Sequence, residues 1–310
     1  MKLSKINEIA ERELEEQPES VEEIVGGLMN KTLRLKYGEE SYILQVNDKT
    51  EAHEMENNLN CFKFFKDSRL PVPVTVTDEV KEYDSSHYII VEDLKADSLN
   101  EDISPENSRA SARYLAYIHD YKSFEKAGWW DWEDGKPEII GFPDGSLKGR
   151  IRDNLEDNLE FFREEDIDWL VEVAERFLND YMDLVPTEFE PVFVHHDYNP
   201  GNILVENSEV VGILDFDYAH ASHGQRDLVK AANNFWLRGG VERQDIYDGY
   251  REVQELDESF EENEPVYRLE TLIDVLKAML ELDNMTVEEA QEYRDNIEKT
   301  EEKIEAILKA

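Results

Sequence analysis

The chain has 310 residues, 40% of them hydrophobic, so it is long enough to bury a core in one large domain or in two lobes. Its 74 acidic and 33 basic residues give a formal net charge of −41, and such a surface repels nucleic acid and anionic membranes. The chain has a single cysteine, Cys61, no apolar run near the ~20 residues of a membrane span and no signal-peptide core, so it is expected to be cytoplasmic and free of internal disulfides.

The N-terminal third alternates helices with short strands. The predicted elements are, in order, a helix at residues 2–17, strands at 21–25, 33–36 and 41–46, a helix at 50–66, and strands at 74–77 and 88–91. Gly26 and Gly27 predict a turn after the first strand. Pro71 and Pro73 end the second helix and start the strand that follows it.

The rest of the chain has mostly helical periodicity. Ser104 is expected to cap a helix whose first residue is Pro105, and His119 near its end is interpreted as a packing histidine. Further helices are predicted at 166–184, from 225 onward, around 269–280 and at 287–308.

Residues 123–150 are predicted to be irregular and carry Trp129, Trp130 and Trp132 among acidic residues. Aromatic faces next to carboxylates suit a cationic substrate, which they would hold by cation–π contact and by charge. The same side chains would equally fix a long loop to the core. Both interpretations stay open from the sequence.

The most informative stretch is residues 193–217, which reads FVHHDYNPGNILVENSEVVGILDFD. Two runs rich in Ile, Val and Leu, 203–205 and 210–214, predict strands joined by a four-residue hairpin loop. If Val205 pairs with Val210, the start of the first strand lies beside the end of the second strand, at the end of the hairpin away from its loop. The hairpin therefore gathers polar residues from both sides at one end.

Three oxygen donors are expected at that end, namely Asp197 from the preceding loop, Asn202 and Asp215. Pairing in a regular register places Asn202 opposite Ile213, about two residues from Asp215. Mg²⁺ prefers such hard oxygen ligands and leaves room for phosphate oxygens. A separate carboxylate five residues before the amide can take the proton of a hydroxyl nucleophile, as in the catalytic loop of protein kinases.

The pattern H-x-D-x-x-P-x-N, followed by a hydrophobic strand and Ile-Leu-Asp-Phe-Asp, resembles the aminoglycoside phosphotransferases and their relatives. Those relatives include choline, homoserine, fructosamine and methylthioribose kinases. Pro200, and the lack of an Ala-Pro-Glu element after Asp215, favour this family over protein kinases.

The resemblance implies roles for the hairpin residues. Asp197 is expected to be the catalytic base, and Asn202 and Asp215 are expected to hold Mg²⁺. The accessory residues are His195 and Asp217, and a later helix residue, Asp227, is expected to brace the catalytic loop.

The resemblance also implies that ATP lies between two lobes. Gly26 and Gly27 correspond to the turn that covers its phosphates, because glycine lets backbone N–H groups approach closely. Glu92 and Leu94 belong to the segment that links the lobes, where backbone groups hold adenine.

One position departs from the family. Gln45 stands on the third strand where relatives carry a Lys or Arg that grips the phosphates. Gln donates a hydrogen bond but offsets no charge, so either it does a weaker version of the same work or nucleotide binding is impaired. Glu56 is expected to be the helix glutamate that faces this strand position.

The predicted fold is α+β, two-lobed and protein-kinase-like. Residues 1–94 are expected to form a small, β-rich nucleotide-binding lobe, and residues 95–310 a larger, mainly helical catalytic and substrate-binding lobe. The implied activity is ATP-dependent phosphorylation of a small-molecule hydroxyl. The alternatives are a non-catalytic nucleotide-binding protein, which only Gln45 supports, and a protein kinase.

The acidic residues and the tryptophans favour a cationic or polyhydroxyl substrate. Because acids are spread along the whole chain, the composition resembles that of halophilic archaeal proteins, whose KCl-rich cytoplasm screens charge within about 3 Å at molar salt. A surface that serves only solubility explains the same composition.

Overall fold

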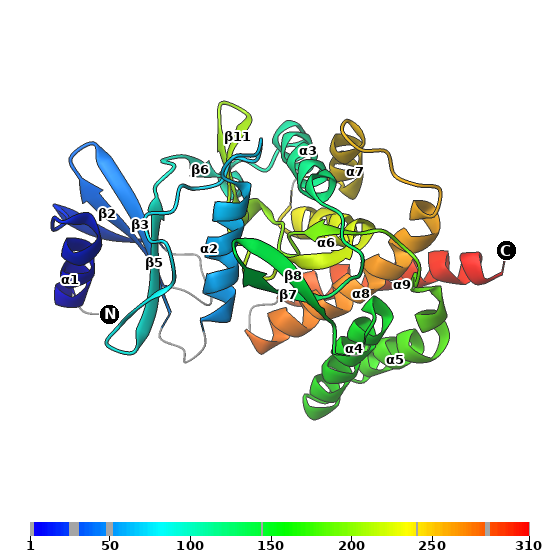
Figure 1. Ribbon diagram of the computed structural model, residues 1–310. Helices are drawn as coiled ribbons and strands as arrows, with labels where there is room; N and C mark the ends of the chain where they lie inside the picture. Colours follow the sequence, from blue (N-terminus) through cyan, green and yellow to red (C-terminus); the bar gives the residue numbers. More distant parts are fainter. Residues whose placement is uncertain are drawn as a thin grey trace.

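The computed structural model describes residues 3–24, 31–47, 52–143, 145–239, 241–282 and 286–309. It confirms the α+β, two-lobed fold, with a small sheet-containing lobe on the left of Figure 1 and a larger, mainly helical lobe on the right. Helix α2 (His53–Phe65) stands between the sheet and the larger lobe.

The small lobe is built on an antiparallel sheet with strand order β1-β2-β3-β5-β4. Its other elements are α1 (Leu3–Leu14), β1 (Ser20–Ile24), β2 (Lys31–Tyr37), β3 (Glu40–Asn47), β4 (Lys81–Tyr83) and β5 (Ser86–Glu92). Successive side chains of β5 point to opposite faces, so Tyr88 and Ile90 pack with α1, whereas Ile89 and Val91 join the main core that includes α2. The sheet is therefore covered on both sides.

The larger lobe packs helices around short antiparallel sheets with the strand orders β11-β10-β6, β12-β9 and β7-β8. Its strands are β6 (Asp97–Ser98), β7 (Trp129–Glu133), β8 (Lys136–Gly141), β9 (Pro191–Val194), β10 (Ile203–Glu206), β11 (Glu209–Ile213) and β12 (His220–His223). Its helices are α3 (Pro105–Tyr121), α4 (Leu147–Glu164), α5 (Asp168–Arg176), α6 (Gly224–Leu237), α7 (Arg243–Arg251), α8 (Phe260–Glu281) and α9 (Val287–Leu308). Within the described residues, no helix has both the length and the apolar character needed to cross a bilayer.

Three predicted segments need correction. Residues 123–150 are not irregular, because they contain the β7–β8 hairpin and the start of α4. The two-residue turn Asp134-Gly135, with φ angles of 49° and 72°, closes this hairpin and is a strong hairpin signal. Residues 74–77 form one bridge, Thr75 to Val91, instead of a strand. The α-helix predicted at 166–184 ends at Arg176. A π-helical turn, Phe177–Tyr181, and a 3-10 turn, Met182–Leu184, follow it.

The hairpin of β10 and β11 forms as predicted, with one change of register. Val205 pairs with Val210, but a bulge between Leu204 and Val205 shifts the rest of the ladder by one residue. Ile203, rather than Asn202, therefore pairs with Ile213. Asn202 therefore lies opposite Leu214, one residue from Asp215 instead of two.

Helices α3 and α7 approach so closely that only glycine fits between them. A Cβ at Gly249 on α7 would lie 2.4 Å from the backbone oxygen of Arg109 on α3. We expect Gly249→Ala to lower the free energy of unfolding by about 1–3 kcal/mol in chemical denaturation, because the helices must move apart. The control is Gln244→Ala on the exposed face of α7, expected to change it by less than about 0.5 kcal/mol. Equal stability of the two variants would contradict the close approach.

Candidate active site

The loop after β9 and the end of the hairpin are tied together by hydrogen bonds. Asn202 Nδ2 donates to the backbone oxygen of Asp197 at 2.9 Å and to its Oδ2 at 3.0 Å. The N–H of Leu214 donates to the backbone oxygen of Asn202 at 2.9 Å, which places Asp215 at the same turn. The three predicted residues Asp197, Asn202 and Asp215 therefore lie together.

His195 links the loop to the strand that precedes Asp215. Its Nε2 donates to the backbone oxygen of Leu214 at 3.0 Å, and its Nδ1 accepts from the N–H of Asp197 at 3.3 Å. Burial lowers the pKa of His195, although Asp227 and Asp197 act in the opposite direction. A neutral ring has one donor and one acceptor, and the two contacts use both. His195 therefore positions the loop and supplies no charge.

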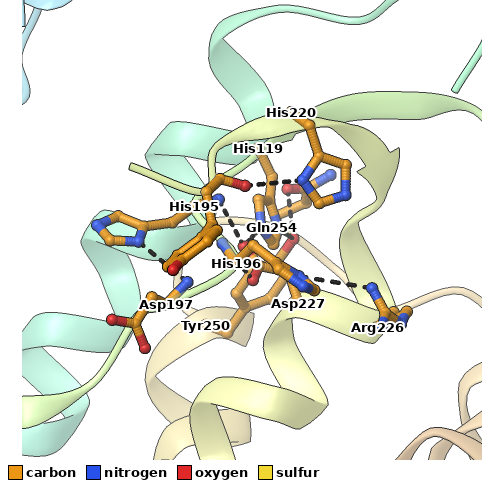
Figure 2. A network of polar contacts seen from close by, with 10 residues as sticks. His119, His195, His196, Asp197, His220, Arg226, Asp227, Tyr250 and Gln254 are labelled. Carbon is orange, nitrogen blue, oxygen red and sulfur yellow. Dashed lines mark hydrogen bonds and ion pairs between the residues drawn. The ribbon is translucent and has the colours of Figure 1, made fainter. Parts of the chain in front are cut away.

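Asp227 on α6 fixes the backbone of the loop that follows β9, as Figure 2 shows. Its carboxylate accepts from the backbone N–H groups of His195 at 2.8 Å and His196 at 2.9 Å, and from His119 Nε2 at 3.1 Å. Burial by itself would raise the pKa of Asp227, but these hydrogen bonds outweigh it and keep the pKa below its ordinary value. The expected bracing role of Asp227 and the packing role of His119 are confirmed.

Asp215 and Asp217 concentrate negative charge beside Asp197. Burial, followed by the charge of Asp197, raises the pKa of Asp215 to about 6. Burial and the charge of Asp215 raise the pKa of Asp217 well above its ordinary value. Carboxylates held this close share a proton unless a cation neutralises them.

These residues fit a Mg²⁺ ion. Because Asn202 donates through Nδ2, its amide oxygen would serve as a hard ligand together with the carboxylate of Asp215 at the same turn. Within the described residues, His, Cys, Asp and Glu side chains alone form no three-ligand metal cluster. The amide oxygen, and the phosphate oxygens of a nucleotide, would be needed to complete the coordination.

Two adjacent asparagines of α2 fix the Asp-Phe-Asp segment. The N–H of Phe216 donates to Asn58 Oδ1 at 3.0 Å. Asn57 Nδ2 lies within hydrogen-bonding distance of three backbone oxygens, those of Phe216 at 3.0 Å, Asp217 at 3.1 Å and Ala219 at 3.0 Å. Sequence reasoning missed both asparagines. The available signal was a pair of poor helix formers at positions that periodicity assigns to a buried helix face.

The tryptophans of β7 meet the same asparagine. Trp130 Nε1 and Trp132 Nε1 donate to Asn57 Oδ1 at 2.8 and 2.9 Å. Trp130 is only 2% exposed, and Trp132 packs on Phe64. For these two residues the structure shows the alternative in which tryptophan fixes a segment to the core. Trp129 is half-buried and points elsewhere, toward His220.

Gln45 on β3 also contacts α2. Its Oε1 accepts from Asn58 Nδ2 at 3.4 Å, so a neutral amide pair stands where the resemblance implies an ion pair. The expectation that Glu56 faces this position is wrong, because Glu56 lies on the exposed face of the helix. Gly26 and Gly27, the predicted phosphate-covering turn, lie outside the described residues.

The segment that links the two lobes is fixed by Asp93, which lies between the predicted residues Glu92 and Leu94. Asp93 is buried, and its Oδ2 accepts from Arg34 Nε at 2.7 Å and from Ser41 Oγ at 2.7 Å. Glu92 ends β5 with its side chain exposed, and Leu94 is half-buried. The chain between the lobes is thereby tied to β2 and β3.

Fold and site together define a kinase-like phosphotransferase. The model of the phosphotransferase enzyme family matches residues 20–262, and the chain belongs to that family. A search of curated proteins found no match.

Solved structures of similar fold share little sequence with the chain. A thermostable mutant of aminoglycoside phosphotransferase APH(4)-Ia, in complex with AMP-PNP and hygromycin B, is 15% identical over 98% of both chains, with a TM-score of 0.69. A putative fructosamine-3-kinase from Haemophilus somnus is 13% identical over 96% of this chain and 97% of its own, with a TM-score of 0.65. The gentamicin complex of APH(2")-IIa is 14% identical over 96% and 94%, with a TM-score of 0.60.

The role of Asn57 can be tested by removing its amide. Asn57→Ala would leave two buried indole donors and several carbonyl oxygens without a partner, so we expect the free energy of unfolding to fall by about 1–3 kcal/mol or more. Tryptophan emission should shift to the red as the indoles gain water. Asn60→Ala, at a half-buried position of the same helix, is the control. Indistinguishable stability and emission in the two variants would exclude this role.

The charge at Asp215 predicts a pH-dependent stability. Folding raises the pKa of Asp215 from 3.8 to about 6. The protonated carboxyl therefore adds to the free energy of unfolding of the metal-free protein below pH 3.8, and this contribution is lost as the pH rises through 6. Asp215→Asn should therefore stabilise the protein in EDTA at pH 8 by roughly 1–3 kcal/mol. The gain, followed by thermal unfolding, should disappear near pH 4. Asp131→Asn on exposed β7 is the control, and a gain independent of pH would show that charge is not its cause.

Proposed function

We propose that the protein transfers the γ-phosphate of ATP to a hydroxyl group of a small molecule. The observation that carries the proposal is the meeting of Asp197, Asn202 and Asp215 at one end of the hairpin, in a chain of the phosphotransferase family. ATP as the donor is supported by the ATP analogue AMP-PNP in the complex of APH(4)-Ia.

In the proposed reaction, Asp197 accepts the proton of the acceptor hydroxyl as its oxygen attacks the γ-phosphorus and the bond to the bridging oxygen breaks. The contacts of Asn202 and His195 keep the loop that carries Asp197 in place. Asn202 and Asp215 would hold Mg²⁺, which when bound supplies positive charge to the phosphates. The carboxylate of Asp217 would help to bind the Mg²⁺ ion.

We place the nucleotide between residues 1–94 and 95–310. Gly26 and Gly27 would cover its phosphates, and the backbone around Glu92 and Leu94 would meet the base. Gln45 would contribute a neutral hydrogen bond in this arrangement, because Asn58 already orients its amide. Phosphate charge would then be balanced by the metal.

The acceptor is proposed to be a small molecule with a free hydroxyl. Two of the three tryptophans no longer support a cationic acceptor, because Trp130 and Trp132 donate hydrogen bonds to Asn57. We propose that the enzyme works in the cytoplasm, where ATP is available, and that assays belong in concentrated KCl, where the charge of −41 is screened.

Removal of the proposed base tests the reaction. Asp197→Ala should reduce acceptor-dependent ATP consumption at least about a hundredfold, because proton transfer to a positioned base is lost. The far-UV circular dichroism and melting temperature should stay close to those of the wild type. Asp131→Ala, at an exposed position of β7, should keep full activity. Unchanged turnover in Asp197→Ala would remove Asp197 from the mechanism, and turnover that persists in EDTA would remove the metal.

A further inference from the structure

A group of basic side chains lies beside the catalytic loop of this very acidic protein. Arg226 and Lys230 project from α6, and Arg150 from α4. His196, the neighbour of Asp197, reaches toward Arg226 in Figure 2. Its Nδ1 is 3.5 Å from Arg226 Nη1, and its Nε2 is 3.3 Å from Lys230 Nζ.

Ring contacts connect Arg150 to the same place. The guanidinium carbon of Arg150 lies 5.8 Å from the ring centroid of Trp129. The Trp129 ring is 4.5 Å from that of His220, which is 4.8 Å from that of His196. Burial, aided by neighbouring cations, lowers the pKa of His220 to about 3 and that of His196 well below its ordinary value. The histidines are therefore neutral, and the arginines and the lysine provide the positive charge.

The charges of this group are only partly balanced. Arg226 is paired with Glu270, at 3.2 Å from Nε and 2.5 Å from Nη2. In the part of the chain that the structure describes, no carboxylate oxygen lies within 4.0 Å of a side-chain nitrogen of Lys230 or Arg150. Two cations thus remain without a direct counter-charge.

A second acid, Asp274 on α8, belongs to the same surroundings but is occupied. Its carboxylate accepts from Asn154 Nδ2 at 2.9 Å and from Asn158 Nδ2 at 2.6 Å. Burial and Glu270 raise its pKa to about 6, and Lys230 acts against this rise from a distance. Asp274 therefore weakens the field of Lys230 without pairing with it.

These residues, called the basic group below, are enclosed by several elements yet keep solvent contact. His196, Lys230, Arg150, Trp129 and Asp274 are all half-buried, although they come from the catalytic loop, α6, α4, β7 and α8. Partly buried cations without a counter-ion are unfavourable unless an anion binds to them. Arg and Lys are also the side chains that bind carboxylate and phosphate groups best.

We infer that the acceptor alcohol carries a negatively charged oxyanion, a carboxylate or a phosphate, which binds between Lys230 and Arg150 while the hydroxyl meets Asp197. This inference rests on the proposed function and refines it, because it gives the acceptor a negative charge where the sequence favoured a cationic or polyhydroxyl molecule. His196 is the residue that joins the two parts of the site, since its side chain contacts Lys230 and its backbone leads directly to Asp197.

The test is an acceptor screen with matched pairs, using the full-length protein, ATP and Mg²⁺ in concentrated KCl. Glycerate is compared with glycerol, gluconate with sorbitol, and glucose 6-phosphate with glucose, while choline and kanamycin form the cationic arm. We expect the carboxylate or the phosphate member of a pair to show at least a tenfold higher kcat/KM than its neutral partner, and the pairs tell the two oxyanions apart. A preference for neutral or cationic acceptors would overturn the inference.

Variants then locate the oxyanion. Lys230→Met and Arg150→Met should each raise the KM of the best anionic acceptor at least tenfold, and Lys230→Arg should restore most of the affinity. Arg152→Met, on the exposed face of α4, should leave that KM unchanged. Equal KM values for Lys230→Met and Arg152→Met would overturn the assignment.

A binding measurement separates this inference from the proposed function. If no alcohol is phosphorylated, the proposed function fails, and the basic group is judged by the thermal shift that gluconate or glucose 6-phosphate produces relative to sorbitol or glucose. A shift in the wild type that is lost in Lys230→Met supports the oxyanion site. No shift with either anion overturns it.

Discussion

The arrangement of the active site depends on holding Asp197, Asp215 and Asp217 close together in a partly buried place. Burial and then their mutual repulsion raise the pKa values of Asp215 and Asp217, so the metal-free site is electrostatically unfavourable. The rest of the fold must supply the free energy that keeps these carboxylates in position. A bound cation with its phosphates would relieve the repulsion, which is why an unfavourable arrangement suits phosphoryl transfer.

The contacts that hold this arrangement are mostly neutral. His195 joins the loop to the hairpin as an uncharged ring, and Asn57 and Asn58 fix the following segment through amide groups. The pair of Gln45 and Asn58 likewise replaces the ion pair that the family resemblance implies. Neutral hydrogen bonds do not depend on ionic strength as exposed ion pairs do. In a chain of charge −41, these contacts of the site therefore depend less on salt than the charged surface does.

Helix α2 is held from both lobes. The small lobe contacts it through β3, and the larger lobe through the β7–β8 hairpin, whose two indoles share Asn57 Oδ1 with each other. The two sides of the proposed site have opposite charge. Carboxylates collect at the hairpin for the metal, while α4 and α6 bring Arg150 and Lys230 to the acceptor side. This separation favours an acceptor that does not compete with the metal for the carboxylates.

The sequence alone determined the two-lobed fold and the local grouping of Asp197, Asn202 and Asp215, because strand patterns and a short hairpin loop bring together residues that are close in the chain. It did not reveal the bulge, the contacts of Asn57 and Asn58, or the grouping of basic side chains beside the loop of Asp197. These depend on contacts between residues far apart in sequence, such as Asn57 with Phe216, and on whether Glu56 or Asn58 faces the strand. The sequence does not indicate which partner a polar residue will have in the folded protein. Only packing therefore decided which polar groups are buried and which cations remain unpaired.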